Sequence, residues 1–444
     1  MKPVRVIGGG LAGCEAAWQI SRRGYAVELL EMRPGRSTPA HRTADLAELV
    51  CSNSLKSTRT DRANGLLKEE MRLAGSLILE AAAAASIPGG SSLCVDRNRF
   101  SSFVEGAIRD RGNITVRREE VTEVPRGEPV VIATGPLTSD ALSASLQTLL
   151  GLESLFFYDA IAPTIDAESI DWETVFVQDR YQEPGSGSYV NCPLDREQYR
   201  SLVSALRASD TLKPRDFEDE RYFEACLPIE VMASRGVDTL AFGPMRPVGL
   251  THPATGRRPH AVVQLRPENR EGTMFSMVGF QTRLSFRDQE AVFRTIPGLE
   301  KARFERMGTI HRNTYVDAPS ALDRFQRARR RPGLFFSGQL AGVEGYVESA
   351  ASGLMTGLYV CHALQGREPE PPPPTTMIGA ILDRLSCPEP APFQPVNAQF
   401  GLLPPPEDPT LKKDRRREAL ALRALDDMAA YLESTRAGIP VSAG

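Results

Sequence analysis

A cysteine at position 51 lies in the stretch LVCSNSLKS, among small polar residues. A free cysteine usually behaves as a small hydrophobic residue and packs in a core. The polar neighbours of Cys51 and the positive charge of Lys56 are instead typical of a reactive thiol, because a nearby cation favours the thiolate. Cys51 is therefore a candidate reactive group beside a cofactor, and a buried structural role stays open at this point.

The first forty residues have the pattern of a dinucleotide-binding βαβ unit. Residues 4–7 (VRVI) predict a short buried strand, residues 14–24 a helix, and residues 26–30 a second strand that finishes at Glu31. The segment GGGLAG between the first strand and the helix supplies the motif GxGxxG.

Each part of this motif has a physical role. Gly8 permits a tight turn, Gly10 lets the backbone approach a pyrophosphate, and Gly13 lets helix and strand pack closely. The helix N-terminus offers N–H groups to the phosphates, and Glu31 can accept hydrogen bonds from ribose hydroxyls. The predicted cofactor-binding residues here are Gly8, Gly9, Gly10, Leu11, Ala12, Gly13 and Glu31.

Two later segments favour FAD over NAD. Residues 130–135 (VVIATG) predict a strand that runs into a turn common in flavoproteins, and residues 333–339 (GLFFSGQ) predict another strand before a loop and a Gly/Ala-rich helix. Such a C-terminal segment closes the FAD site of two-part flavoproteins, although many have Asp where this chain has Gln339. The residues expected to contact the cofactor are Ala133, Thr134, Gly135, Gly338, Gln339, Gly342, Glu344, Gly345 and Tyr346.

The same segments predict an α/β fold: a Rossmann-like FAD-binding domain of the two-part type with an inserted α+β domain. We expect residues 1–150 and 305–370 to form the discontinuous FAD-binding domain and residues 151–304 to form the inserted substrate domain. Residues 371–444 are expected to form a Pro-rich connector and a C-terminal helical tail that packs on the FAD domain.

Composition indicates a soluble protein of 444 residues with a net charge of −3, so any nucleic-acid contact must be local. Its seven cysteines have no zinc or iron–sulfur spacing, and a chain this long does not need a disulfide framework, so no metal is expected. The glycines and Glu15 argue against a signal peptide, and no segment is apolar enough to span a membrane. We expect a cytoplasmic protein.

Four long blocks resemble one known family. FEACLPIEVMASRG, CSNSLKS, IPGLEKARFERMGTIHRNTYVDAP and FFSGQLAGVEGYVESAASGLMTG are similar to segments of the folate- and FAD-dependent tRNA (uracil-5-)-methyltransferases, the TrmFO family. The resemblance covers nearly the whole chain. These bacterial enzymes make the 5-methyluridine of the tRNA T-loop without S-adenosylmethionine.

The resemblance implies that methylenetetrahydrofolate donates the carbon, that reduced FAD takes part, and that NADPH or NADH reduces the flavin. It also places functional cysteines at Cys51 and Cys226. We assign Cys226 as the thiolate that adds to uracil C6 and Cys51 as the thiol that removes the C5 proton or guards the methylene intermediate, and the two roles could be exchanged. Cys14 and Cys361, inside predicted helices, are expected to be structural.

Other candidates are a histidine and two basic segments. His311 in GTIHRNTY is a candidate contact for folate or flavin, and a structural role is about equally expected; Arg312 and Asn313 share that status. Residues 324–331 (RFQRARRR) and 412–417 (KKDRRR) are candidate contacts for tRNA phosphates, although such runs are often only solvated faces.

Two alternatives to the methyltransferase hypothesis are kept. One is a flavoprotein of the related MnmG/GidA group, which modifies wobble uridines with a GTPase partner. This chain is short for that group. The other is a flavoprotein that binds tRNA without catalysis. For the methyltransferase itself no obligate protein partner is expected.

Overall fold

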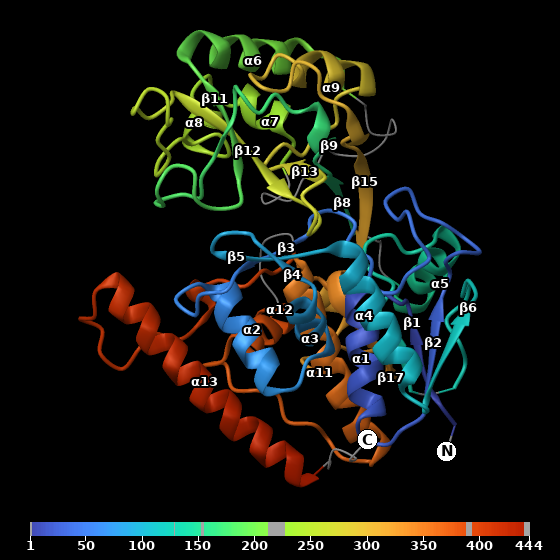
Figure 1. Cartoon of the computed structure of the whole chain (residues 1–444). Coiled ribbons are helices and arrows are strands. Elements are labelled where there is room, and N and C mark those ends of the chain that lie inside the picture. The colour runs from blue at the N-terminus through green and yellow to red at the C-terminus, as the bar shows by residue number, and fades with distance from the viewer. Residues whose placement is uncertain (1, 128, 152–154, 212–226, 388–392, 439–444) are drawn as a thin grey trace.

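A computed structural model describes residues 2–127, 129–151, 155–211, 227–387 and 393–438. Figure 1 shows two bodies, one above the other, joined by a pair of strands, with a long helix across the lower body. The predicted strands and helices of the nucleotide motif are present, at Val4–Ile7 (β1), Leu11–Ser21 (α1) and Val27–Glu31 (β2).

The lower body is built on a six-stranded sheet in the order β16-β17-β7-β1-β2-β6. All neighbours pair in parallel except β16 with β17. Parallel strands place their carboxyl ends at one edge, so the residues after β1, β7 and β17 meet there. The other strands of this sheet are Ile114–Arg118 (β6), Val130–Ile132 (β7), Arg327–Ala328 (β16) and Arg331–Phe336 (β17).

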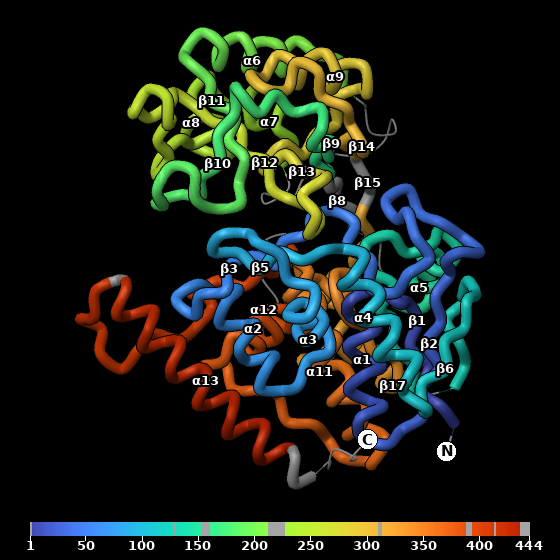
Figure 2. Tube along the Cα trace, viewed as in Figure 1, coloured from blue at the N-terminus to red at the C-terminus, as the bar shows by residue number. Residues whose placement is uncertain are grey.

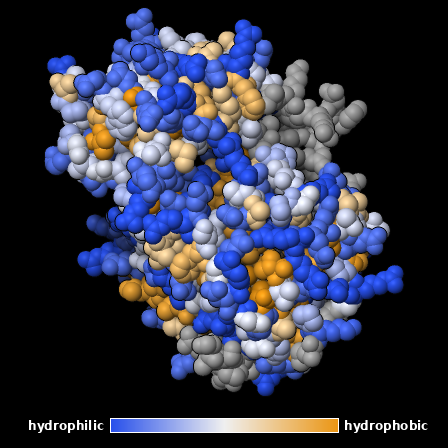
Figure 3. All heavy atoms as spheres, turned by 45° about the vertical axis from the view of Figure 1, so that its right-hand side comes forward, coloured by the Kyte–Doolittle hydropathy of each residue, from blue (hydrophilic) through white to orange (hydrophobic). Residues whose placement is uncertain are grey.

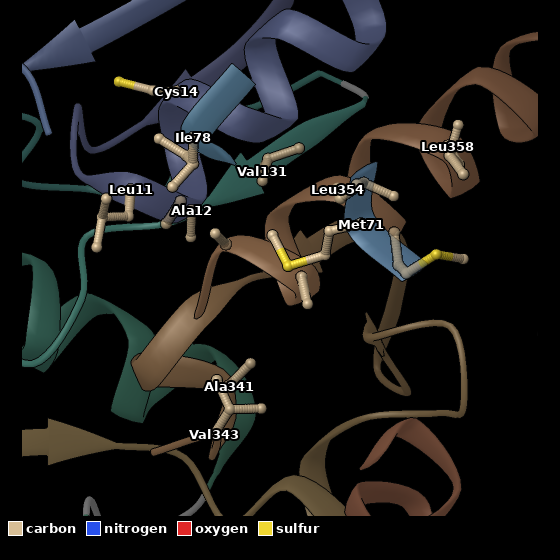
Figure 4. Close-up of a cluster of buried hydrophobic side chains, with 14 of the residues drawn as sticks. Leu11, Ala12, Cys14, Met71, Ile78, Val131, Ala341, Val343, Leu354 and Leu358 are labelled. Atoms are coloured by element: carbon tan, nitrogen blue, oxygen red, sulfur yellow. The ribbon is translucent and has the colours of Figure 1, made fainter. Parts of the chain in front are cut away.

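Helix α11 (Tyr346–Leu364) packs directly on α1, because small residues line the contact. A Cβ added to Gly353 would lie 2.2 Å from the carbonyl oxygen of Ala12, and one on Gly357 would lie 2.9 Å from that of Ala16. Figure 4 shows side chains from α1, β7 and α11 meeting in the core beneath this contact. The close packing brings the N-termini of both helices to the same edge of the sheet.

The upper body contains an antiparallel sheet in the order β10-β11-β12-β13-β9-β14. Its core is separate from that of the lower body and contains only residues between 165 and 302. The strands are Thr164–Asp166 (β9), Phe176–Val177 (β10), Val190–Leu194 (β11), Ala261–Pro267 (β12), Met274–Met277 (β13) and Phe304–Arg306 (β14), and the helices are Arg196–Ala208 (α6), Ile229–Ser234 (α7), Thr239–Phe242 (α8) and Phe286–Phe293 (α9).

A two-stranded ribbon connects the bodies (Figure 2). Strand β8 (Leu155–Ala160) leaves the lower body and β15 (Ile310–Tyr315) returns to it, paired antiparallel. We propose on these separate cores the domain division expected from the sequence, with residues 1–150 and 305–370 below and 151–304 above, except that β14 extends the upper body to Arg306.

The remaining elements belong to the lower body. A small sheet in the order β3-β5-β4 lies beneath the upper body. The long helix α13 contributes Leu420, Ala424 and Met428 to the same core as α1, which supports a tail packed on the lower body. The elements are Ser54–Ser57 (β3), Ala63–Leu73 (α2), Leu77–Ala84 (α3), Ser86–Ile87 (β4), Ser92–Val95 (β5), Arg97–Asp110 (α4), Asp140–Leu150 (α5), Ala318–Ala321 (α10), Met377–Ser386 (α12) and Lys413–Gly438 (α13).

A buried carboxyl group attaches the tail. Both oxygens of Glu70, on α2, accept hydrogen bonds from the first N–H groups of α12, at 2.7 Å from Met377 N and 2.8 Å from Ile378 N. Glu70 is completely buried. Burial raises its pKa to about 8, against the opposing effect of the two N–H donors.

Glu70→Gln is expected to lower the free energy of unfolding most at low pH. At pH 5 the amide must turn its NH₂ group towards one backbone donor, which costs about 1–3 kcal/mol. Because the pKa of Glu70 rises on folding, its stabilising contribution is complete below pH 4.5 and is lost as the pH rises through about 8. The difference in free energy of unfolding between the wild type and Glu70→Gln therefore narrows as the pH rises.

Urea unfolding of the wild type and Glu70→Gln at pH 5, 6, 7 and 8 measures this difference. Glu69→Gln is the matched control, and because its side chain is one-third exposed we expect a change within about 0.5 kcal/mol. A difference that widens with pH would contradict the account of Glu70.

Candidate active site

The turn after β1 is shaped by three glycines. Gly8 has φ +105°, and a Cβ there would lie 2.5 Å from the carbonyl oxygen of Ala133. A Cβ on Gly13 would lie 1.8 Å from the carbonyl oxygen of Gly8, so only glycine lets α1 pack this closely. A Cβ on Gly10 would meet nothing within 4 Å. The open space at Gly10 is therefore available to a ligand.

Glu31 holds this turn from the end of β2. One carboxylate oxygen accepts the N–H of Gly9 at 2.8 Å, and the other accepts the backbone and side-chain N–H groups of Arg33 at 3.0 and 2.9 Å. Burial raises the pKa of Glu31, but the hydrogen bonds and charge of Arg33 and the N–H of Gly9 outweigh it, so the pKa is below its ordinary value. The ionised carboxylate thus positions the glycine turn, a role that the sequence did not predict.

A pocket opens between the ends of β1, β2 and β7. It brings together the glycine turn, Glu31 and the turn of residues 133–135. Thr138, just after this turn, donates its Oγ1–H to the carbonyl oxygen of Gly135 at 2.9 Å. Its lining residues include Gly8, Gly10, Glu31, Arg33, His41, Thr134, Leu137 and Ser139.

The turn of residues 338–346 lies beside the N-terminus of α1. Gly338 has φ +72°, and a Cβ there would lie 2.7 Å from the Cβ of Ala12. Gly342 and Gly345 also have positive φ, at +94° and +117°, and Gly345 is the residue before α11. The backbone N–H of Glu344 donates to Val396, and the carbonyl oxygen of Gln339 accepts the N–H of Gly342.

Cys51 is held by this turn. The N–H groups of Cys51 and Ser52 donate to the hydroxyl oxygen of Tyr346 at 2.7 and 3.2 Å. Cys51 itself is half-buried. Burial, and next to it the proximity of Cys51, raises the pKa of Tyr346, so the hydroxyl stays neutral. The predicted reactive thiol and a predicted cofactor contact therefore lie together.

Arginines from both bodies complete the support of the Cys51 loop. Arg97 of α4 donates to the carbonyl oxygens of Leu49 and Cys51. Arg266 of β12 donates to Ser52 Oγ at 2.9 Å and to Asn53 Oδ1 at 2.8 Å. The loop is thereby fixed between the nucleotide edge and the upper body.

Several charged residues surround the Cys51 loop. Lys56 makes an ion pair with Glu348 at 3.5 Å, which satisfies its charge. Arg97 pairs with buried Glu268; burial lowers the pKa of Arg97, but the carboxylate outweighs this and raises it. Burial, and then the charge of Arg97, lowers the pKa of Arg306 at the end of β14. Arg97, which donates to the carbonyl oxygen of Cys51, is therefore a second cation at this loop besides Lys56.

The other residues predicted from the sequence fall into two groups, those whose side chains lie outside the described part of the chain and those that are buried. Cys226 lies outside the described residues, and for His311 and Arg312 only the backbone of β15 is described. Asn313 is buried, and its amide nitrogen has no hydrogen-bond partner within the described ranges. Cys14 and Cys361 are fully buried; burial raises the pKa of Cys14, and raises that of Cys361 to about 12, in agreement with structural roles.

Four residues of the site were not predicted from the sequence: Arg97, Arg266, Glu268 and Arg306, although Arg306 lies within the block IPGLEKARFERMGTIHRNTYVDAP. They come from segments far apart along the chain and meet only through the contact between the two bodies.

Tyr346→Phe is expected to slow the reaction at Cys51 by about 100-fold, because a shift of about 1 Å in a reacting group has an effect of that size. The variant removes the acceptor of two backbone N–H groups and leaves the ring in place. The single-turnover rate of the reaction at Cys51 measures the effect. The flavin content of the purified variant shows whether the cofactor site is intact.

Tyr359→Phe, on the same helix, is the matched control. Its hydroxyl is buried and lacks a hydrogen-bond partner among the described atoms, so its removal should leave the rate unchanged. Equal rates for the two variants would show that the Tyr346 hydroxyl does not position Cys51.

The residues present fit FAD. The first turn of α1 contains no acidic residue and its N-cap makes no side-chain hydrogen bond, so the N–H groups and positive dipole end of this turn suit a pyrophosphate. The open space at Gly10 also suits a bound ligand. So does the amide nitrogen of Asn313, which has no hydrogen-bond partner among the described residues. The next residue, Thr314, donates its N–H to the carbonyl oxygen of Pro136, next to the 133–135 turn. The fold and this edge define a Rossmann-type flavoprotein of the two-part class.

Comparison with known proteins agrees. Residues 3–368 match the family model described as "Glucose inhibited division protein A". A crystal structure of GidA from Aquifex aeolicus superposes with a TM-score of 0.69 at 18% identity, covering 98% of this chain and 75% of that chain. At this identity the likeness establishes the fold alone.

Sequence relatives are much closer. A protein of Geobacter sulfurreducens is 52% identical over 429 residues, covering 97% of this chain and 98% of its own, and one of Moorella thermoacetica is 53% identical over 423 residues, covering 95% and 97%. Both are named methylenetetrahydrofolate--tRNA-(uracil-5-)-methyltransferase TrmFO. The chain belongs to the TrmFO family, within the larger family of glucose inhibited division protein A.

Proposed function

We propose that this protein transfers the methylene carbon of methylenetetrahydrofolate to C5 of the T-loop uridine in tRNA, as an FAD-dependent methyltransferase. The structural observation that carries the proposal is the position of Cys51. Its loop is bonded to Tyr346 at the nucleotide edge and to Arg266 of the upper body, so a thiol lies where a cofactor and a substrate held between the bodies would meet. The names of the relatives supply the substrates.

The chain's own residues would hold FAD at three places. These are the glycine turn with Glu31, the turn of residues 133–135, and the turn of residues 338–346. When bound and reduced by NADPH or NADH, FAD supplies the reducing equivalents that convert a methylene to a methyl group. His311 stays a candidate contact for folate or flavin, because its strand β15 returns the chain to this edge.

The two cysteines would perform the acid–base and nucleophilic chemistry on uracil. The Cys226 thiolate forms a bond to C6, and the electron pair of the C5–C6 double bond moves to give a nucleophilic C5. After C5 has bonded to the methylene carbon, the Cys51 thiolate accepts the C5 proton. The electron pair left at C5 forms an exocyclic double bond to that carbon, and the bond from the carbon to its carrier nitrogen breaks with its electron pair going to the nitrogen. Addition of a hydride to the carbon, with the reducing equivalents named above, moves the exocyclic electron pair into the ring, where it re-forms the C5–C6 double bond and expels the Cys226 thiolate.

The structure separates the two basic segments. In residues 324–331, Arg327 pairs with Asp323 and Glu368, and Arg331 donates to the carbonyl oxygens of Pro125 and Gly127, so two of the five arginines hold the fold together. Residues 414–416, at the start of α13, are exposed. We therefore favour the start of α13 for tRNA phosphates.

The target base must be turned out of the T-loop, at a cost of a few kcal/mol.

Among the described residues no helix is both long and apolar enough to cross a bilayer, and the face shown in Figure 3 is largely hydrophilic. We propose a cytoplasmic location, where tRNA, folate and NADPH are available.

Expression in a bacterium whose own T-loop methyltransferase gene is deleted tests this function. We expect 5-methyluridine to return to the T-loop, as measured by mass spectrometry of digested tRNA, and the wobble uridine to be unchanged. In a second host that lacks its own wobble-uridine flavoprotein, restoration of a wobble modification that depends on a GTPase would favour the MnmG/GidA-like alternative. Bound tRNA without any new modification would favour the non-catalytic alternative.

A further inference from the structure

A second cleft lies between the two bodies, apart from the nucleotide pocket. From the lower body it is lined by Ser57 at the end of β3, by Arg59 and Arg62 after that strand, and by residues 89–92. From the upper body it is lined by the loop of residues 179–189 and by Gln264 and Val278. Nothing in the chemistry described above uses this cleft.

The cleft carries positive charge. Arg180 donates to Gln264 Oε1 at 3.1 Å and to the carbonyl oxygens of Arg246 and Val248 at 2.7 and 2.8 Å, and none of its described contacts is a carboxylate. Arg59 and Arg62 add two further cations, of which Arg59 pairs with Asp61. Three arginines thus border a polar cleft.

The acidic residue of the cleft wall is occupied by its own loop. Asp179 Oδ1 accepts the N–H groups of Ser188 and Tyr189 at 2.9 and 3.1 Å. These bonds, with those from Gly185 N to Val177 and from Asp179 N to Ser186, fix the loop of residues 179–189. The carboxylate therefore organises the loop that carries Arg180 and Tyr181.

This loop presents an exposed aromatic ring. Tyr181 is 79% exposed and has φ +67°, a conformation that is costly for a bulky residue. Its N–H donates to the carbonyl oxygen of Gly249 at 2.8 Å, and a Cβ on Gly249 would come within 3.0 Å of the ring. The fold therefore holds a tyrosine ring at the cleft with most of its surface open to a ligand.

The cleft leads to the Cys51 loop. Gln264 lines the cleft, and Arg266 lies two residues further along β12, about 6.6 Å away on the same face of the strand. Arg266 donates to Ser52 Oγ, next to Cys51. A chain lying in the cleft would thus pass close to the reactive thiol.

We propose that this cleft binds the single-stranded RNA next to the target uridine, with a base stacked on Tyr181 and phosphates near Arg59, Arg62 and Arg180. Stacking on an exposed aromatic ring beside arginines is the common way to hold an unpaired strand without reading its sequence. The proposal rests on the proposed function and extends it, because it names the surface that holds the tRNA strand once the base has been turned out.

The test compares full-length variants by fluorescence anisotropy with a labelled, unmodified tRNA transcript. Tyr181→Ala is expected to raise the Kd about 10-fold, and Tyr181→Phe, which keeps the ring, to stay within about twofold. Arg62→Ala should weaken binding. A plot of the logarithm of the association constant against the logarithm of the salt concentration should become less steep by about one. Phe242→Ala is the matched control, because Phe242 is 82% exposed on the upper body and does not line the cleft.

Flavin content and reduction of the flavin by NADPH, measured without tRNA, should be unchanged in every variant and so report that the protein is folded. Wild-type affinity of Tyr181→Ala for tRNA would overturn the proposal. So would a raised KM for methylenetetrahydrofolate with unchanged tRNA affinity, which would assign the cleft to folate. If the wild type does not bind tRNA, the proposed function itself fails together with this extension.

Discussion

Cys226→Ala is expected to lower the rate of methyl transfer by about 10⁴-fold or more, the usual size of the loss when a covalent nucleophile is removed. Without a thiolate bonded to C6, C5 of uracil has no electron pair to offer to an electrophilic carbon. Flavin content and tRNA affinity should be unchanged, because the side chain acts only on the reacting base. Single-turnover transfer to an unmodified transcript measures the loss.

Trapping with tRNA that contains 5-fluorouridine separates the roles of the two cysteines. Fluorine cannot be removed as a proton, so the bond between the nucleophilic thiol and C6 persists and is seen as a shifted band on a denaturing gel. We expect the adduct with Cys51→Ala and none with Cys226→Ala, and Cys387→Ala, at an exposed cysteine, serves as the control. The reverse pattern would exchange the two roles.

Gly13→Val is expected to abolish FAD binding. The new Cβ would lie 1.8 Å from the carbonyl oxygen of Gly8, so α1 must move away from β1 and the phosphate-binding turn must change shape. Overpacking alone costs about 1–3 kcal/mol of stability. Flavin absorbance after purification and the thermal midpoint measure the two effects.

Two further glycine variants make this prediction specific. Gly10→Ala places a methyl group in the open space at the turn, so we expect a folded protein that binds FAD weakly. Gly106→Ala, on α4, where a Cβ also meets nothing, should keep full flavin content and be slightly more stable. Normal flavin content in Gly13→Val would contradict the assignment of this turn to the cofactor.

Local patterns predicted most of the nucleotide-binding edge. The strand of residues 4–7, the glycine turn and the strand ending at Glu31 lie within thirty-one consecutive residues, so spacing alone defines them. An inserted second domain was expected from the strand-like segments between residues 151 and 304, and the separate core of the upper body supports that proposal. The role of Glu31 in bonding Gly9 was not, since the pattern indicates only an acidic residue at that position.

The support of Cys51 could not be predicted from sequence. Cys51 and Tyr346 are 295 positions apart, and Arg97 and Glu268 are 171 apart. These contacts depend on the packing of α11 on α1 and on the position of the upper body against the lower body. Both involve segments that are far apart along the chain. The segment RFQRARRR also shows the limit of charge patterns, because part of its charge is paired within the fold.

The central claim is that this chain moves a one-carbon unit from folate to tRNA. The most direct measurement incubates the purified protein with unmodified tRNA, NADPH and methylenetetrahydrofolate labelled on its methylene carbon, followed by mass spectrometry of the digested RNA. We predict labelled 5-methyluridine in the T-loop without S-adenosylmethionine or a protein partner. Unlabelled tRNA, with a flavin that NADPH still reduces, would contradict the claim.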